Sequence, residues 1–334
     1  MDRVHISKNV LVISILIVSF TLISAGCALK PTAPANSDSS MPVSTISSIY
    51  ASGEPFDFSK LGNFEFDKVI EISVGEKEDQ LTYAFKGELA EEGPADFAIA
   101  NNGDIYILDS CRGSGGVDNR ISVYSGGTWV RNIDYSANVE FGSKITILNN
   151  NIYVFGGIYN TGDTYLVKMS LDGEFQTRYT FSSEYEPINT GSLTAIDNRL
   201  IIFGLGNNKI FELDEDAMKF VESDVIVDVK TVDNYTKHVT YGKSEWDVKV
   251  EDFKANFDVL GKTEDNDAYL IFYQPTNVLC KYDKNGIPTA QISSSDYLKD
   301  FVYISDRYYV AEDGSLYLMV AKESSIIIYK SSVS

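Results

Sequence analysis

The stretch that decides the fold is Asn101-Asn102-Gly103-Asp104-Ile105-Tyr106-Ile107-Leu108-Asp109, a polar turn followed by a short apolar strand centred on Tyr106. Another strand follows at Asn119-Arg120-Ile121-Ser122-Val123-Tyr124, and after Gly126-Gly127 a further one begins at Trp129-Val130-Arg131. Short apolar runs separated by Gly and Asn turns predict antiparallel strands joined by hairpins.

The same pattern recurs along the chain. Aligned on Tyr106, the anchor positions are 106, 153, 201, 269 and 317, so the spacings are 47, 48, 68 and 48 residues. The later copies of the anchor strand are 149–156, 197–204, 266–271 and 313–319, and each is followed by another strand, at 164–169, 209–213, 277–282 and 325–329. A period in the forties built only of short strands and turns is typical of a β-propeller, an all-β fold in which four-stranded sheets stack face to face around an axis.

The last copy ends after its third strand, at Tyr329. Val69-Ile70-Glu71-Ile72-Ser73-Val74, near the start of the repeated region, alternates as a strand should and can supply the missing outer strand. We therefore predict that an N-terminal strand closes the ring, which removes a free sheet edge.

The 68-residue interval is the irregular one. It contains a hairpin-like stretch, 237–241 and 246–250 around a turn at Gly242-Lys243-Ser244. This stretch is either a degenerate blade or an inserted hairpin. Five blades are visible in the sequence, and counting the interval as a blade predicts six.

The N-terminus differs in character from the rest. Arg3 and Lys8 precede an uncharged apolar run, Val10 to Ala25, and Ser24-Ala25-Gly26-Cys27 resembles the cleavage box of bacterial lipoproteins, with Ser24 where that family commonly has Leu. The resemblance implies a signal peptide at 1–26, a diacylglycerol on the Cys27 thiol and further acylation, for example with palmitate. The alternative is a transmembrane anchor, but the run is shorter than the about 20 residues that span a bilayer.

A Pro-, Ser- and Thr-rich segment follows. Residues 27–60 contain Pro31, Pro34, Pro42 and Pro55 and few large apolar side chains, so we expect a flexible tether with a reach of about 30 Å. The propeller domain is then 61–334. The expected location is the extracytoplasmic face of the cell membrane, with the bilayer as a partner through acylated Cys27.

The first copy resembles one blade of the NHL-type propellers, in which Gly-x-Ile-Tyr-Val-x-Asp is followed by Asn-Arg-Ile-x-Val-Phe. Here the matching runs are 103–109 and 119–124, separated by an insertion that contains Cys111 and Arg112. The other copies have diverged. The resemblance implies the propeller fold and, more weakly, a binding scaffold, because some relatives are lyases or esterase-like enzymes.

The composition restricts the chemistry. The chain has 28 Lys and Arg against 48 Asp and Glu, a net charge of −20, which disfavours nucleic acid as a partner. Beyond the signal peptide the one histidine is His238, so a His-based zinc site, a Ser-His-Asp triad or a Cys-His pair would each need it; we interpret it as a structural strand residue. Cys111 and Cys280 fall in different modules, so we do not expect them to form a disulfide.

Carboxylates are abundant, and a structural Ca²⁺ is compatible with them, but no cofactor is predicted. Asp214-Glu215-Asp216 resembles a calcium loop in charge only and is interpreted as a solvated turn. Propellers of the gluconolactonase kind bind a catalytic divalent metal, but no residue-level match carries those positions over to this chain.

The loops between the second and third strands of each blade lie on the face where propellers usually bind ligands. They are Ser110–Asn119, Gly156–Asp163, Gly204–Asn208, Tyr273–Asn277 and Ala321–Ser325. Their polar and aromatic side chains predict a ligand-binding site for a carbohydrate or peptide, formed by Arg112, Tyr159, Asn160, Asn207, Tyr273 and Gln274.

The sequence therefore predicts a membrane-anchored β-propeller lipoprotein that binds or scaffolds a carbohydrate, peptide or protein ligand, and no catalytic residue is assigned. The alternative is a divalent-metal-dependent lyase or lactonase-type enzyme with its site at the mouth of the central channel.

Overall fold

Strands of three to twelve residues make up most of the described structure. The computed structural model of the chain describes residues 55–82, 84–86, 89–109, 119–135, 141–157, 163–180, 190–204, 210–251, 256–273, 277–293, 303–311, 313–322 and 324–333. All of them fall in the unit formed by residues 44–334. The helix found there is the 3-10 turn η2 (Phe58–Lys60). No helix in these ranges is long and apolar enough to cross a membrane.

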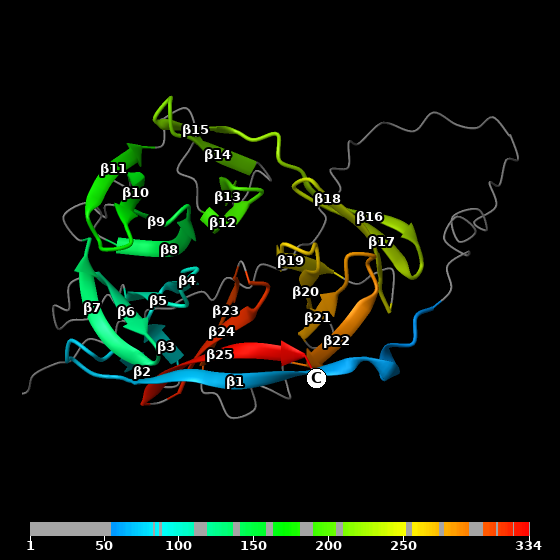
Figure 1. Cartoon of the computed structure of the whole chain (residues 1–334), viewed down its shortest axis with the longest axis horizontal. Coiled ribbons are helices and arrows are strands. Elements are labelled where there is room, and N and C mark those ends of the chain that lie inside the picture. Colours follow the sequence, from blue (N-terminus) through cyan, green and yellow to red (C-terminus); the bar gives the residue numbers. More distant parts are fainter. Residues whose placement is uncertain are drawn as a thin grey trace, which may run out of the picture. The chain divides into compact units, whose positions relative to one another are not determined.

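Four of the blades consist of four consecutive antiparallel strands each (Figure 1). Blade 1 is β4 (Asp96–Ile99), β5 (Ile105–Asp109), β6 (Arg120–Ser125) and β7 (Thr128–Asp134). Blade 2 is β8 (Phe141–Leu148), β9 (Asn151–Gly157), β10 (Thr164–Ser170) and β11 (Phe175–Thr180). Blade 3 is β12 (Thr190–Ile196), β13 (Arg199–Gly204), β14 (Ile210–Asp214) and β15 (Lys219–Glu222). Blade 5 is β19 (Phe257–Lys262), β20 (Ala268–Phe272), β21 (Val278–Tyr282) and β22 (Pro288–Ser293).

Blade 4 occupies the irregular interval. It is a three-stranded sheet of β16 (Val227–Asp233), β17 (Thr236–Tyr241) and β18 (Ser244–Lys249), so the predicted hairpin is part of a degenerate blade and not an insertion. Its apolar face packs between neighbours, because Val239, Trp246 and Val248 share a buried cluster with Ile201 of blade 3 and Leu270 of blade 5. Together with blade 6, described next, this confirms the prediction of a six-bladed all-β propeller.

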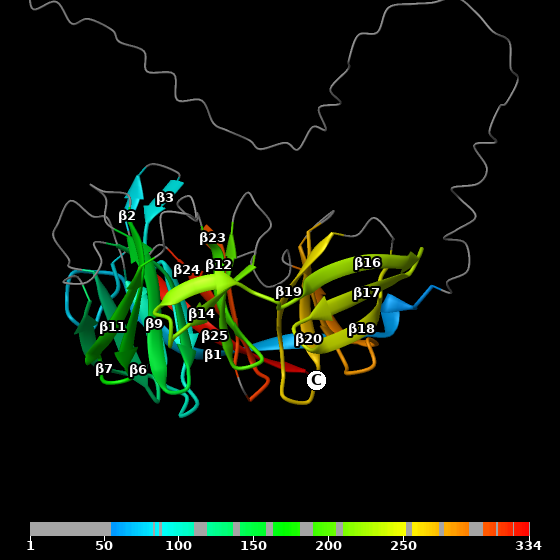
Figure 2. The ribbon, with the colours of Figure 1, turned by 90° about the horizontal axis from the view of Figure 1, so that it is seen from above.

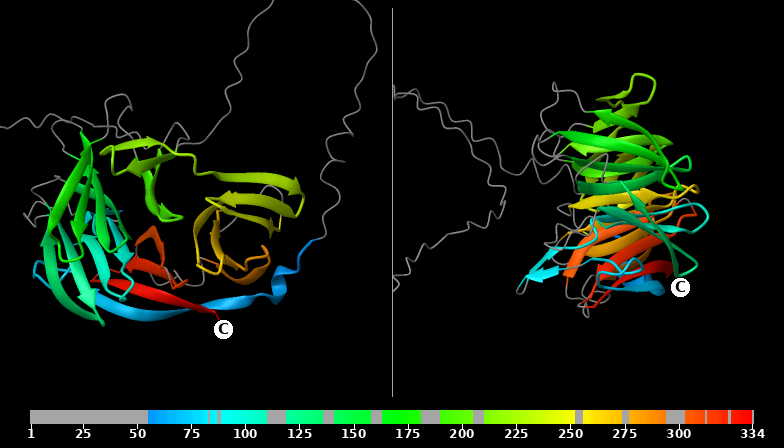
Figure 3. Two further views of the ribbon diagram at one scale, coloured as in Figure 1. Left: turned by 45° about the horizontal axis from the view of Figure 1, so that its top comes forward. Right: turned by 90° about the vertical axis from the view of Figure 1, so that its left-hand side faces the viewer.

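Blade 6 contains both ends of the repeated region. Three strands come from the C-terminus, β23 (Tyr303–Val310), β24 (Leu316–Ala321) and β25 (Ser325–Val333), and the outer strand is β1 (Gly62–Ser73). β1 runs antiparallel along β25 from Phe64 opposite Val333 to Ser73 opposite Ser325 (Figure 3). The predicted N-terminal closure is therefore confirmed, with a β-bulge between Lys68 and Ile70. β1 also pairs in parallel with β22 of blade 5 at Gly62 and Asn63.

A small hairpin precedes blade 1. It consists of β2 (Ala84–Lys86) and β3 (Leu89–Glu92), which form a two-stranded sheet of their own. Figure 2 shows it projecting above the sheets of the ring.

The tyrosines of the repeat connect neighbouring blades. The Tyr106 hydroxyl of blade 1 donates to the Leu171 carbonyl of blade 2 at 3.4 Å, and that of Tyr269 in blade 5 donates to the Gly314 carbonyl of blade 6 at 2.9 Å. In each case the acceptor lies in the turn that follows a strand of the next blade. A ring that packs in one blade and a hydroxyl that bonds to the next explain why Tyr recurs at this anchor position.

Tyr153 occupies the anchor position of blade 2, and its hydroxyl donates to a side chain of the next blade and not to a carbonyl group. The Tyr153 hydroxyl donates to Glu215 Oε1 at 2.7 Å, and Lys168 Nζ lies 2.8 Å from Glu215 Oε2. Burial alone would raise the pKa of Glu215, but the bonds from Lys168 and Tyr153 outweigh it and lower the pKa. Glu215 lies in an exposed turn, as the sequence predicts for Asp214–Asp216, and its side chain is 48% exposed. The turn is not only a solvated connection, because the Glu215 carboxylate ties blade 3 to blade 2.

Candidate functional site

Charged side chains meet on the innermost strands where blades 6, 1 and 2 adjoin. β4 contacts β8 on one side and β23 on the other. Asp96, at the start of β4, accepts a hydrogen bond from the Ile145 amide of β8 at 3.0 Å. Burial raises the pKa of Asp96, while the charges of Lys144 and Arg307 oppose that rise.

Arg307 belongs to this junction by its place on β23. It lies on the same face of the strand as Tyr309, whose ring centroid is 6.0 Å from that of Phe97 on β4. Asp96 is thus a buried carboxylate near enough to two basic side chains for their charges to act on it. Such an arrangement can orient a polar ligand, but its acid is already bonded to the backbone.

Tyr273 is the predicted ligand-binding residue that the described structure contains. It directly follows β20 of blade 5, in the loop that leads to β21, and its side chain is 40% exposed. Its hydroxyl donates to Asp258 Oδ2 at 2.6 Å, and its amide donates to the Asn256 carbonyl at 3.1 Å. Because Asp258 lies on β19, the innermost strand of the blade, these bonds hold the ring on the inner side of the blade with part of its surface in solvent.

The other predicted site residues lie outside the described residues. They are Arg112, Tyr159, Asn160, Asn207 and Gln274, together with the lipidation residue Cys27.

His238 lies on β17, where its Nδ1 is 2.8 Å from Asp247 Oδ1 of β18. The pair lies on the face of blade 4 that is turned away from the Val239 core, which agrees with a structural strand residue. Cys280 is a free, buried thiol in blade 5, and burial raises its pKa to about 12, so it is not a nucleophile at neutral pH.

Metal ligands do not gather in the described part of the chain. Among those residues no group of three or more His, Cys, Asp or Glu side chains is arranged to hold a metal ion. The carboxylate of Glu215, in the segment that resembled a calcium loop, is engaged by Lys168 and Tyr153.

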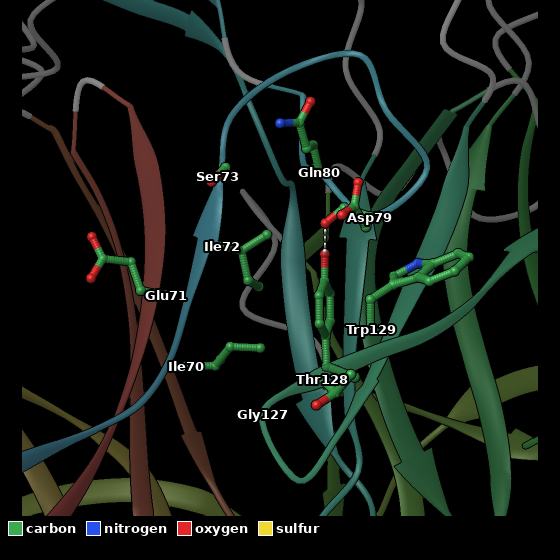
Figure 4. Close-up of a pocket in the computed structure, with 10 residues that line it drawn as sticks. Ile70, Glu71, Ile72, Ser73, Asp79, Gln80, Gly127, Thr128 and Trp129 are labelled. Atoms are coloured by element: carbon green, nitrogen blue, oxygen red, sulfur yellow. Dashed lines mark hydrogen bonds between the residues drawn. The ribbon is translucent and has the colours of Figure 1, made fainter.

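A groove of about 380 Å³ lies at the outer junction of blades 6 and 1 (Figure 4). Ile70 and Ile72 point into it from β1, while Glu71 points the other way, and Trp129 lies on the opposite side. Its remaining lining consists of Ser73, Asp79, Gln80, Tyr124, Gly127 and Thr128.

Many polar groups around this groove already have protein partners. The Tyr124 hydroxyl donates to the Asp79 carbonyl at 3.3 Å, and Trp129 Nε1 donates to Asn132 Oδ1 at 3.3 Å. Glu71 pairs with Lys68 and accepts from Ser325. The groove is therefore best explained as the seam where the ring closes.

A network of hydrogen bonds fastens this seam, and it uses the NHL-like residues. Asp109 and Arg120 form a buried ion pair, with Arg120 Nη2 3.1 Å from Asp109 Oδ2. Arg120 also donates to the carbonyls of Glu78 and Gln80, in the loop that follows β1. Burial raises the pKa of Asp109, and Arg120 opposes that rise.

Sequence reasoning did not find Asp96, Lys144 and Arg307. The repeat was aligned on the second strand of each blade, and the innermost strands have no shared motif that would mark their positions. The groove was missed for a similar reason, because its two walls lie far apart in the chain.

Comparison with known proteins gives distant structural likenesses to bacterial proteins. No protein-family model matches the sequence, and no curated protein is similar to it in sequence. Among solved structures, a DUF4221 family member from Bacteroides vulgatus is 8% identical with a TM-score of 0.46, covering 82% of this chain and 99% of that one. A protein of unknown function from Bacteroides thetaiotaomicron is 12% identical with a TM-score of 0.44, covering 80% of this chain and 76% of that one. This likeness concerns the fold alone.

Proposed function

We propose that this protein is a membrane-anchored, extracytoplasmic propeller lipoprotein that binds a carbohydrate, peptide or protein ligand on the face that carries the loops between the second and third strands of its blades. The observation that carries the binding role is Tyr273, an aromatic ring that is 40% exposed although its hydroxyl and amide are both bonded. A ring with these bonds is ordered before a ligand arrives, so binding costs little side-chain entropy.

The chemistry around Tyr273 suits a sugar or a peptide. The exposed part of the ring offers an apolar surface for stacking, and Asp258, which is exposed, keeps a second carboxylate oxygen that can accept a hydrogen bond from a ligand hydroxyl or amide. Arg112, Tyr159, Asn160, Asn207 and Gln274 belong to the same set of loops and complete the proposed site.

The binding role is tested with an array of soluble oligosaccharides and short peptides probed with the full-length chain. We expect Tyr273→Ala to weaken binding of the compounds that the native chain retains by about fivefold to tenfold, since an aromatic contact is worth about 1 to 1.4 kcal/mol. Tyr273→Phe keeps the ring and should retain most of the binding. Phe175→Ala, which removes a 50% exposed ring from β11, is the matched control. Equal binding by the native chain and Tyr273→Ala would refute this site.

The proposal of a lipid anchor at Cys27 is supported by the sequence of the first 60 residues. We expect the native chain, produced in a bacterial host fed an alkyne fatty acid, to carry the label and to sediment with the membranes. Cys27→Ser should abolish the label. Cys111→Ser is the control that keeps the leader and Cys27 intact. Labelling that persists in Cys27→Ser would contradict the lipoprotein assignment.

A further inference from the structure

β16 is the open edge of the irregular blade. The sheet order is β16-β17-β18, and no other strand of the described residues pairs with β16. The opposite edge, β18, is covered, because the Lys249 amide donates to the Gly286 carbonyl in the β21–β22 turn of blade 5. That turn sits so close to β18 that a Cβ on Gly286, whose φ is +74°, would lie 2.5 Å from the Asp247 carbonyl oxygen. Figure 2 shows β16 at the outer edge of the three strands.

Exposed apolar side chains are concentrated at this edge. Ile226 is 56% exposed, Val229 40% and Val232 48%. An edge strand with exposed apolar residues is a template for pairing with another strand unless it is protected. Here the protection is slight, since it consists of a bulge between Thr231 and Asp233 and the charges of Asp228 and Lys230.

The backbone groups that face outward can be identified. The Gly242 amide donates to the Ile226 carbonyl at 2.9 Å, and since hydrogen-bonded pairs alternate along an antiparallel ladder, Asp228 and Lys230 also bond to β17. The amide and carbonyl groups of Val227, Val229 and Thr231 therefore point away from the sheet. The Val229 amide confirms this direction, because its partner is the Asp228 carboxylate at 2.9 Å and not β17.

The sequence around β16 is complementary in charge and in apolar character to its own reverse. The segment, centred on Val229, is Ile226-Val227-Asp228-Val229-Lys230-Thr231-Val232. In an antiparallel pair of two such strands, Asp228 of one copy lies opposite Lys230 of the other, twice. Ile226 lies beside Val232, and Val229 lies opposite Val229. A shift of the register by two residues is the smallest that keeps the outward groups paired. In one direction it places Lys230 opposite Lys230, and in the other it places Asp228 opposite Asp228, so like charges face each other and the remaining charged residue lies opposite an apolar one.

We propose that two copies of this chain associate through β16, as an antiparallel strand pair with its two-fold axis at Val229. The sheets of two blades then form one continuous six-stranded sheet, and the interface is isologous, as in most homodimers. Charge complementarity selects a second copy over an unrelated strand. Within a single chain, Asp228 Oδ2 is 3.0 Å from Lys230 Nζ, and dimer formation exchanges the two such contacts, one in each copy, for two contacts between the copies.

The dimer is expected to be weak. One short strand buries less than the about 1,200 Å² of stable interfaces, so the dissociation constant should be in the micromolar range or above and should rise with salt. Two copies anchored in one membrane would meet at a higher effective concentration than two copies in solution.

Sedimentation equilibrium of the full-length chain in density-matched detergent, from about 1 to about 100 μM, measures the association. Asp228→Lys alone and Lys230→Asp alone each put like charges opposite each other at two places and should raise the dissociation constant by about tenfold or more. The double variant Asp228→Lys/Lys230→Asp restores opposite charges and should restore the dimer. A monomer at every concentration, or a double variant as weak as the single ones, would overturn the proposal.

A second variant tests the position of the two-fold axis. Val229→Cys should give, on mild oxidation, a disulfide-linked dimer whose cross-linked peptide contains residue 229 from both copies. Val130→Cys is the matched control, because Val130 is a similarly exposed residue (45%) on the outer strand β7 and should give no such peptide. Cross-linking of both variants to the same extent would indicate random collision and would overturn the register.

Discussion

Deletion of residues 66–76 is expected to abolish cooperative unfolding of the whole propeller. This segment contains most of β1, which pairs with β25 from Phe66 opposite Ser331 to Ser73 opposite Ser325. Ile70 and Ile72 are 7% and 3% exposed, and burial of two such side chains contributes about 3–6 kcal/mol before the lost backbone bonds are counted. That sum is comparable to the about 5–15 kcal/mol that stabilises a typical domain.

The effect should extend beyond blade 6. The loop after β1 is bonded to blade 1 by Arg120 and Asn132, and the start of β1 pairs with blade 5. The N-terminal segment thus joins three blades, and its loss leaves an open edge on β25. Thermal unfolding followed by near-ultraviolet circular dichroism gives the measurement.

The matched control is deletion of residues 84–92, the β2–β3 hairpin, which pairs with no other described strand. It removes a similar length of chain and should leave the melting transition cooperative. A cooperative transition at the native temperature after deletion of 66–76 would show that the ring does not depend on this closure.

Arg120→Met is expected to lower the free energy of unfolding by about 3–5 kcal/mol, because it leaves a buried carboxylate without its counter-charge. The side chains of Arg120 and Asp109 are 11% and 0% exposed. The substitution also removes the two bonds to the carbonyls of Glu78 and Gln80, which hold the loop after β1. Urea unfolding measures the change.

Lys330→Met is the control for this prediction. Lys330 forms an ion pair with Asp313 at 3.1 Å, but the two side chains are 40% and 56% exposed, so solvent screens the pair and its loss should cost less than about 1 kcal/mol. If the two variants lose similar amounts of stability, the Asp109–Arg120 pair does not fasten the seam.

The position of the NHL-like residues illustrates where sequence reasoning was incomplete. The motif correctly indicated a propeller blade, but it did not reveal what Asp109 and Arg120 contact. Their partners lie in residues 78–82, which have neither a repeat nor a regular strand pattern. A contact between a motif and an irregular loop leaves no periodic signal in the sequence.

The type of residue at each anchor position of the repeat was informative, in addition to the spacing of these positions. Tyr occupies four of the five anchors, and in blades 1, 2 and 5 its hydroxyl bonds to the following blade. The one anchor that is not Tyr is Ile201, in blade 3, and the next blade is the three-stranded blade 4. The absence of Tyr at this anchor is therefore a signal that could have marked blade 4 as the irregular one.

The amino-acid sequence by itself determined the strand pattern, the turns and the need for an N-terminal closing strand, because strand periodicity and turn chemistry depend on neighbouring residues. The tertiary structure alone decided that residues 227–249 form a blade, that Asp109 and Arg120 fasten the closing seam, and that β16 is left as an open edge of that blade. These features depend on which blades meet when the ring closes, and the side chains that meet are up to hundreds of residues apart in the chain.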